Sequence, residues 1–233
     1  SLLGRWQHVE YVMGFNLDRR LLDTFGAITT VPGAAGAFRT AALRDVGGLS
    51  DDTLAEDTDL TIAIQRAGWR VAFEDSAIAW TEAPASLGDL WRQRYRWCYG
   101  TLQSVWKHRR ALVERRGVGL VGLPYALIFQ VAVALLGPIV DIAVLYGLTT
   151  SQAGDVALGW LGFMLAQLAL AAVALRLDRE SLRPLWSVPL QQVVYRQLMY
   201  LVVIQSVASA LAGTRLRWHK LRRRGLTAFA PPA

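Results

Sequence analysis

Three acidic residues stand together at the start of an amphipathic segment, AEDTDLTIAIQRAGWRV (55–71). Glu56, Asp57 and Asp59 fall within four positions, directly before apolar residues at helical spacing. Carboxylates at a helix N-terminus complement the helix dipole, and carboxylates beside a bound substrate serve as general bases. The spacing of the three acids is compatible with both roles.

A second group of chemically useful residues shares one face of a predicted helix, SLGDLWRQRYRWCYGTLQSVWKHRR (86–110). At about 100° per residue, Gln93, Arg96, Trp97 and Gly100 lie on that face. Arginine makes paired hydrogen bonds to phosphate oxygens, and tryptophan offers a flat apolar surface to a sugar ring. Ordinary packing explains the same face equally well. The opposite face is aromatic, which is typical of a core position or of a helix in the membrane interface.

The elements that must position these residues follow one another as strands and helices. Apolar or aromatic runs at 27–38, 69–75 and 77–83 predict strands, and a short helix after the first run should end at Gly47 and Gly48. This alternation predicts an α/β fold. The segment has too few strands to complete a doubly wound sheet.

The second half of the chain contains three apolar stretches, at 119–148, 156–175 and 188–211. About 20 apolar residues cross a bilayer as a helix, so the second stretch predicts a clean span. The first is longer and contains Pro138, which predicts a helix that is tilted or broken at the proline.

Charged residues set the expected membrane topology. Three full spans would leave the basic tail outside the cytoplasm, so either one stretch does not cross or the tail breaks the positive-inside rule. Asp141 in the first stretch and Arg196 in the third favour a stretch that lies at an interface or cavity. The loop at 176–183 carries three arginines and the other short loop carries none, which places residues 1–117 in the cytoplasm. The basic tail at 213–233 is typical of a patch on anionic lipid rather than of a nucleic-acid site.

Composition narrows the class further. The net charge is +7, hydrophobic residues make up 53%, and the part after residue 117 holds 10 basic and 4 acidic residues. A single cysteine, Cys98, excludes an internal disulfide and a paired-thiol metal site. These features indicate an integral membrane protein.

The two chemical groups together carry a family resemblance. AED (55–57) and QRYRW (93–97) resemble the T/E-D and Q-x-x-R-W motifs of processive family 2 glycosyltransferases, the membrane synthases of cellulose, chitin, hyaluronan and poly-N-acetylglucosamine. The flanking residues 33–73 and 81–92 are most similar to the poly-N-acetylglucosamine synthase type. Ala55 departs from the Thr that the family often has there. Nothing before residue 30 offers the D and D-x-D motifs that hold nucleotide and metal, so the chain resembles the C-terminal portion of such a synthase.

This resemblance implies a partial GT-A-like catalytic domain of α/β class, followed by transmembrane helices. It implies inverting transfer of a sugar from a nucleotide-sugar, such as UDP-GlcNAc, to a growing β-linked polysaccharide. Asp57 would be the base that takes the proton of the acceptor hydroxyl. The residues implied in substrate binding are Glu56, Gln93, Arg96, Trp97 and Gly36. A divalent metal, Mg²⁺ or Mn²⁺, is expected with its ligands outside this chain, so the chain alone should be inactive.

The expected organisation has four parts: the end of a cytoplasmic GT-A-like domain at 1–85, an interface helix at 86–117, two or three spans at 118–212, and a basic cytoplasmic tail at 213–233. The expected location is the plasma (inner) membrane. Expected partners are a nucleotide-sugar donor, a polysaccharide acceptor and membrane lipid, but no nucleic acid.

Two other classes stay open. A non-catalytic membrane scaffold or transporter portion would share the spans and the basic tail. A non-processive lipid-linked sugar transferase would share the base but generally lacks the Q-x-x-R-W motif.

Overall fold

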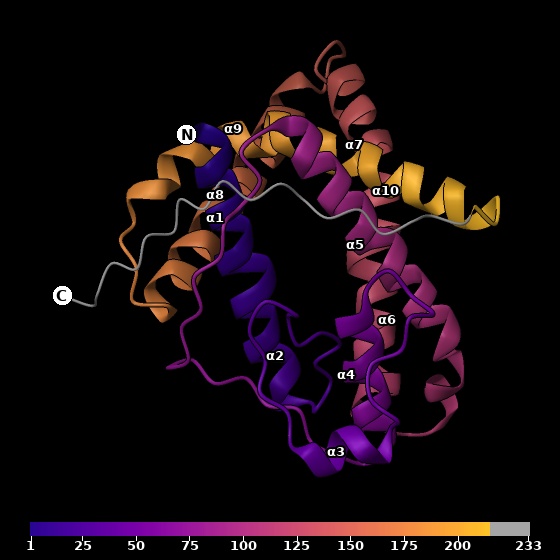
Figure 1. Cartoon of the computed structure of the whole chain (residues 1–233). Helices are drawn as coiled ribbons and strands as arrows, with labels where there is room; N and C mark the ends of the chain where they lie inside the picture. The colour runs from indigo at the N-terminus through magenta and orange to yellow at the C-terminus, as the bar shows by residue number, and fades with distance from the viewer. Residues whose placement is uncertain (215–233) are drawn as a thin grey trace. The chain divides into compact units, whose positions relative to one another are not determined.

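The computed structural model describes residues 1–214, so the predicted basic tail lies outside the described residues except for its first two positions. The chain forms two compact units, one made of residues 1–21 and 125–204, the other of residues 22–124 with the described residues from 205 on. The α-helices (Figure 1) are α1 (Leu2–Tyr11), α2 (Asp18–Thr24), α3 (Thr40–Asp45), α4 (Glu56–Arg66), α5 (Leu87–Lys107), α6 (Leu123–Tyr125), α7 (Val133–Gly147), α8 (Ala153–Leu177), α9 (Val188–Leu190) and α10 (Arg196–Leu211). The π-helical turns are Val12–Leu17, Val118–Gly122, Ala126–Ala132 and Gln191–Tyr195, and the 3-10 turns are Arg109–Val113 and Arg183–Ser187.

The prediction of an α/β fold is wrong, because residues 1–214 contain helices and no strand. A strand exists only as part of a hydrogen-bonded ladder with a neighbour. The first expected strand is instead an irregular segment with a turn at 33–34, and side chains of α4 bond to its backbone. Thr61 Oγ1 accepts a hydrogen bond from Val31 N at 2.8 Å, and the Gln65 amide donates to the Ile28 carbonyl. The two expected strands within 69–83 also lack a ladder partner among the described residues.

The helices predicted for the unit of residues 22–124 are confirmed. The turn after α3 contains Gly47 and Gly48 at φ 79° and 82°, and Gly68 follows α4 at φ 100°, a region that favours glycine. Helix α5 begins after Ser86, whose Oγ accepts a hydrogen bond from Asp89 N at 3.1 Å. Figure 1 shows α4 and α5 of this unit, and the two helices pack against each other.

Helix α4 is buried on two faces. Its apolar residues pack into the core of this unit, which also includes residues of α5 and of the segments around 27 and 118. A second, polar face carries Thr58, Thr61 and Gln65, all buried, and this face bonds to residues 28–31. The buried apolar residues of this unit are Leu22, Ala27, Ile28, Ala42, Ala55, Leu60, Ile62, Ile64, Val71, Leu90, Tyr99, Val105, Ala111, Val118 and Leu123.

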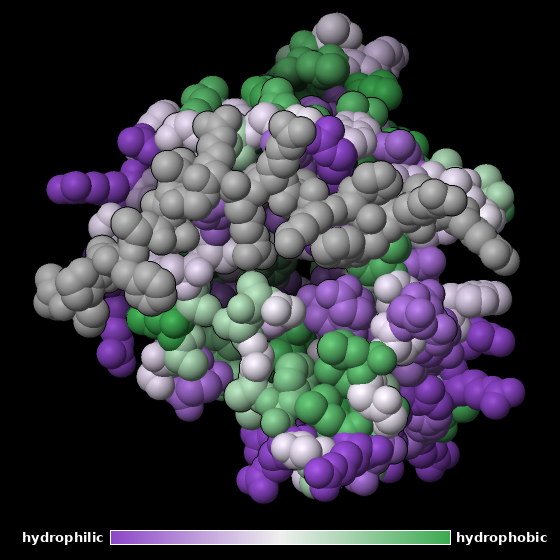
Figure 2. Space-filling model, viewed as in Figure 1, coloured by the Kyte–Doolittle hydropathy of each residue, from purple (hydrophilic) through white to green (hydrophobic). Residues whose placement is uncertain are grey.

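Three helical stretches are long and apolar enough to cross a membrane: Val118–Gly147, Ala153–Leu177 and Arg183–Leu211. Helix α7 continues through Pro138, so of the two predicted alternatives the helix is not broken at this proline, and its tilt in the membrane stays a prediction. Figure 2 shows hydrophobic residues over α7 at the top of the view and, on the other unit, hydrophilic residues beside the end of α5. That one stretch does not cross stays a prediction.

The two charged residues of the apolar stretches meet. Arg196 and Gln197 on α10 both donate hydrogen bonds to the Asp141 carboxylate on α7, and the Arg196 guanidinium lies 5.7 Å from the ring centre of Phe163 on α8. The helices approach closely nearby, because a Cβ on Gly137 would lie 2.1 Å from the Tyr200 ring. Pairing lowers the cost of placing these charges in an apolar region.

The N-terminal helices belong to the same unit as α7 and α8, and the sequence did not predict them. Val9 and Val12 pack against buried residues of α8. Trp6 Nε1 donates to the Ser187 carbonyl at 3.0 Å, and Arg20 forms an ion pair with Asp178 at 3.0 Å.

Candidate active site

Asp57 lies in the first turn of α4 and is half-buried. Its Oδ2 accepts a hydrogen bond from Gly33 N at 3.0 Å, and its Oδ1 accepts one from Thr58 N at 2.8 Å. The carboxylate therefore faces the exposed small-residue loop at 33–37. The neighbouring Glu56 is also half-buried, and its side chain makes no hydrogen bond or ion pair with another residue of 1–214.

The glycines of the loop differ in role. Gly33 lies directly beside Asp57, where an added Cβ would sit 3.5 Å from Oδ2. A Cβ on Gly36 would lie 2.6 Å from Val31 Cγ1 and 3.1 Å from the Phe38 ring. Gly36 therefore serves local packing of the loop, and its predicted part in substrate binding stays a prediction.

Asp59 also lies in the first turn of α4, but its side chain contacts the end of α5. It is only 2% exposed, and its carboxylate accepts hydrogen bonds from His108 Nε2 at 2.7 Å and from Lys107 Nζ at 2.8 Å. His108 Nδ1 lies 3.0 Å from Arg66 Nη1, which can only donate. His108 therefore accepts at Nδ1 and donates from Nε2 to Asp59. Asp59 joins α4 to the end of α5.

Charged partners extend this link on both sides. Lys107 also pairs with Asp52 at 2.8 Å, and Arg66 makes a two-point contact with Glu114. Burial raises the pKa of Asp59, but the hydrogen bonds from His108 and Lys107 outweigh burial and hold this pKa below its ordinary value. The same balance acts on Lys107, where burial lowers the pKa and the bonds to Asp52 and Asp59 raise it above its ordinary value.

The motif face of α5 packs onto the two residues that precede the acidic helix. Gly100 permits this approach, because a Cβ there would lie 2.5 Å from Ala55 N. Arg96 donates to the Leu54 carbonyl at 3.3 Å, and Gln103 Oε1 accepts from Leu54 N at 3.0 Å. The backbone at 54–55 is thus fixed by α5 directly before Glu56 and Asp57.

A second arginine, which sequence reasoning missed, organises the other two motif residues. Arg94 is buried, donates to Gln93 Oε1 at 2.7 Å, and places its guanidinium 4.3 Å from the Trp97 ring centre. Arg94 thus joins Gln93, through a hydrogen bond, to Trp97, through a cation–π contact. Helical spacing puts Arg94 on another face from Gln93, but its long side chain bends back across the helix.

The aromatic face of α5 is largely engaged within its own unit. Trp91 Nε1 donates to Gln205 at 2.8 Å, and the Tyr95 hydroxyl donates to Ser209 at 2.7 Å, so this face packs on the end of α10. Trp106, by contrast, is 71% exposed and lies under the Arg109 guanidinium at 4.7 Å. This face thus packs within the unit at Trp91 and Tyr95 and is exposed at Trp106.

The two chemical groups are joined through the backbone at 54–55. Helices α4 and α5 together carry a carboxylate pair, an amide, two guanidiniums and an indole, and their contact at 54–55 fixes one helix against the other. Such a set can accept a proton, bind hydroxyl groups and neutralise phosphate. Within residues 1–214, no three His, Cys, Asp or Glu side chains are grouped so that they could hold a metal ion.

Comparison with known proteins agrees with these motifs. The chain is 34% identical to the poly-beta-1,6-N-acetyl-D-glucosamine synthase of Staphylococcus aureus (strain COL) over 100 aligned residues. These residues make up 43% of this chain and 24% of that synthase. It is 28% identical to the synthase of the same name from Staphylococcus epidermidis over 130 aligned residues, which make up 56% of this chain and 31% of that relative. The chain thus spans well under two thirds of the length of these relatives. No solved structure matches it significantly.

The strongest assignment covers most of the chain. Residues 1–177 match the family described as glycosyl transferase family group 2, and they include both motifs and the two helices that carry them. The chain therefore belongs to glycosyl transferase family group 2.

Proposed function

We propose that this chain forms the acceptor side of an inverting glycosyltransferase that extends a β-linked polysaccharide at the membrane. UDP-GlcNAc is the proposed donor, and the similarity to poly-beta-1,6-N-acetyl-D-glucosamine synthases supports this choice. The cytoplasmic side of the plasma membrane is the proposed location of the site, supported by the arginines of the loop at 176–183.

One observation carries the proposal. The motif face of α5 is packed directly onto Leu54 and Ala55, so that Gly100 and Arg96 fix the backbone from which Asp57 projects. A catalytic carboxylate must be held within a fraction of an ångström of its productive position. A scaffold would have no need for this register between an acidic helix and a helix bearing amide, guanidinium and indole groups.

In the proposed reaction, the acceptor hydroxyl attacks the anomeric carbon from the face opposite the nucleotide. Asp57 takes the hydroxyl proton as the new glycosidic bond forms, and the bond to the nucleoside diphosphate breaks with inversion. Trp97 offers its indole to the acceptor sugar, and Gln93 binds acceptor hydroxyl groups. Arg96 offsets the negative charge of the leaving diphosphate.

A divalent cation is part of this proposal. It would neutralise the diphosphate of the donor, and residues 1–214 contain no grouping of three metal-ligating side chains for it. Apart from Arg96, the residues of this chain act on the other side of the reaction, where they bind the acceptor and accept its proton.

The test replaces Asp57 by Asn in the full-length protein. Asp57→Asn should lower incorporation of radiolabelled GlcNAc from UDP-GlcNAc into polymer by about 10²- to 10⁴-fold, the usual contribution of a general base. Asp51→Asn is the matched control, because Asp51 is an exposed acid of the preceding loop with no side-chain partner among residues 1–214. Equal incorporation by the two variants would contradict the proposal.

Product length separates the remaining alternative. A processive synthase should release long chains under substrate excess, which run as high-mass material on a gel. Transfer of a single sugar to a lipid would give a short, organic-soluble product and would reassign the protein to lipid-linked sugar transfer.

A further inference from the structure

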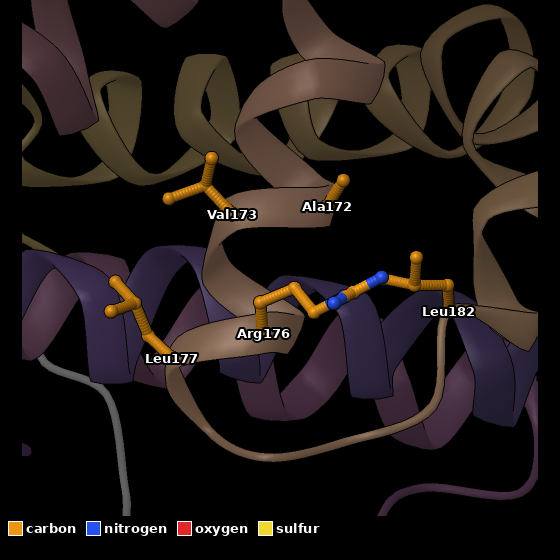
Figure 3. Close-up of a pocket in the computed structure, with 5 residues that line it drawn as sticks. All are labelled: Ala172, Val173, Arg176, Leu177 and Leu182. Carbon is orange, nitrogen blue, oxygen red and sulfur yellow. The ribbon is translucent and has the colours of Figure 1, made fainter.

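An open depression lies at the end of α8. It has a volume of about 360 Å³ and is lined by Ala172, Val173, Arg176, Leu177 and Leu182. Figure 3 shows Ala172 and Val173 one turn before Arg176, whose side chain extends toward Leu182 on the following loop. Four of the five lining residues are apolar, so one guanidinium stands at the edge of an apolar surface on a helix long enough to cross a membrane.

Around this depression the acidic side chains are paired, whereas the arginines are not. The two acids of the loop are already paired, Asp178 with Arg20 at 3.0 Å and Glu180 with His8. The three arginines are exposed, and none of their side chains makes a hydrogen bond or ion pair with another residue of 1–214: Arg176, Arg179 and Arg183. The loop therefore offers uncompensated positive charge beside an apolar surface.

We propose that this depression binds an anionic phospholipid, with one acyl chain along Val173 and Leu177 and the phosphate held by the Arg176 guanidinium. Arg179 and Arg183 add positive charge around the headgroup. Arginine forms paired, charge-assisted hydrogen bonds with phosphate, and an open apolar surface suits a chain that stays partly in the bilayer. The positive-inside rule places this loop at the cytoplasmic leaflet, where anionic lipids are abundant. This inference does not depend on glycosyl transfer.

A simpler role for Arg176 makes a different prediction. A basic residue in the last turn of a helix complements the helix dipole and extends toward the membrane surface. That role requires no preference among lipids. Lipid selectivity therefore distinguishes a phospholipid site from a helix-end charge.

The test measures lipid retention by native mass spectrometry on the whole chain purified in a mild detergent. Phosphatidylglycerol is the probe, phosphatidylcholine is the neutral comparison, and inorganic phosphate tests the headgroup chemistry alone. The wild-type chain should retain one phosphatidylglycerol in preference to phosphatidylcholine, and inorganic phosphate at millimolar concentration should not displace it. Displacement by inorganic phosphate, or equal retention of the two lipids, would overturn the proposal.

Two variants locate the site. Arg176→Gln should weaken phosphatidylglycerol retention about tenfold, the effect of losing one charged hydrogen-bonded contact, and Arg176→Lys should keep part of it. Arg39→Gln is the control, because Arg39 is also exposed and without a side-chain partner among residues 1–214 but lies in the other unit. Val173→Trp should fill the depression and reduce retention while leaving the charge in place. Retention unchanged in both Arg176→Gln and Val173→Trp would refute the site.

Discussion

Gly100 of α5 packs against the backbone of Ala55, and a Cβ at position 100 would lie 2.5 Å from Ala55 N. Because backbone atoms cannot swing away as a flexible side chain can, any larger residue must move one helix. The position of α4 thus depends on the absence of a side chain at Gly100 of α5.

Gly100→Ala should therefore destabilise the protein even though alanine favours helix. We expect a loss of about 1–3 kcal/mol in the free energy of unfolding, typical of overpacking, together with reduced polymer synthesis. Denaturant unfolding in detergent gives the first quantity. Gly159→Ala on α8 is the control, because no atom lies within 4 Å of its added Cβ, and it should be neutral or slightly stabilising. Equal behaviour of the two variants would show that the contact is not tight.

Asp59→Asn should weaken the link between α4 and the end of α5. Removing one partner from a buried charged group costs about 3 kcal/mol, because His108 and Lys107 lose a common acceptor. Asp51→Asn, an exposed change, should cost nothing measurable. Denaturant titrations of both variants at neutral pH measure the difference.

The same network should show in the pH dependence of stability. The folded pKa of Asp59 lies below its ordinary value, so its stabilisation is fully present above about pH 4 and is lost as the pH falls through the folded pKa. The stability gap between wild type and Asp59→Asn should therefore be constant from neutral pH to about pH 5 and shrink in stronger acid. A gap that stayed constant below pH 3 would contradict this role for the carboxylate.

Arg94→Ala should weaken acceptor binding without touching the acidic helix. Arg94 fixes both the Gln93 amide and the Trp97 indole, so its loss frees two groups that the proposed function needs in place. We expect about tenfold weaker binding of a β-1,6-linked GlcNAc oligomer by calorimetry, equivalent to about one charged hydrogen bond. Arg92→Ala removes an exposed arginine bonded to Asp89 and should leave affinity unchanged. Tighter binding in Arg94→Ala would mean that the guanidinium blocks the indole.

The pair formed by Asp141 and Arg196 predicts non-additive effects. Asp141→Asn or Arg196→Gln alone leaves one charge unpaired among apolar helices, whereas the double variant removes both. The double variant should therefore cost less stability than the sum of the single variants, by about 1–2 kcal/mol. Thermal unfolding in detergent completes the double-mutant cycle, and additive costs would rule out coupling.

The sequence predicted α3, α4 and α5, but neither the N-terminal helices nor the conformation of the segments between α3, α4 and α5. The boundaries of α3, α4 and α5 follow from glycines and caps that act locally, at Gly47, Gly68 and Ser86. The runs predicted as strands have β-type composition, but a strand also needs a partner, and local composition carries no information about partners. At Val31 and Ile28 the polar face of α4 supplies the bonds instead.

The candidate site divides in the same way. Helical spacing predicted that Gln93, Arg96 and Trp97 share a face of α5, because it fixes which side chains lie together on a helix. The roles of these residues and of Asp57 stay predictions. Spacing could not place Arg94, whose long side chain reaches a neighbouring face. A carboxylate at the start of a helix can complement the helix dipole, and this interpretation of Asp59 did not predict its partners at the end of α5. The Asp59–His108 contact joins residues 49 positions apart, and a local sequence pattern carries no information about such contacts.

Cys98 lies where α5 meets the end of α10, and it is the only sulfhydryl in the sequence. Burial raises the pKa of this thiol despite a hydrogen bond with Ser206, so little thiolate exists at neutral pH. Alkylation by a maleimide should therefore be slow while the two helices stay together and accelerate when they separate. Within this chain Cys98 thus reports separation of α5 from the end of α10, which can be followed by the rate of labelling.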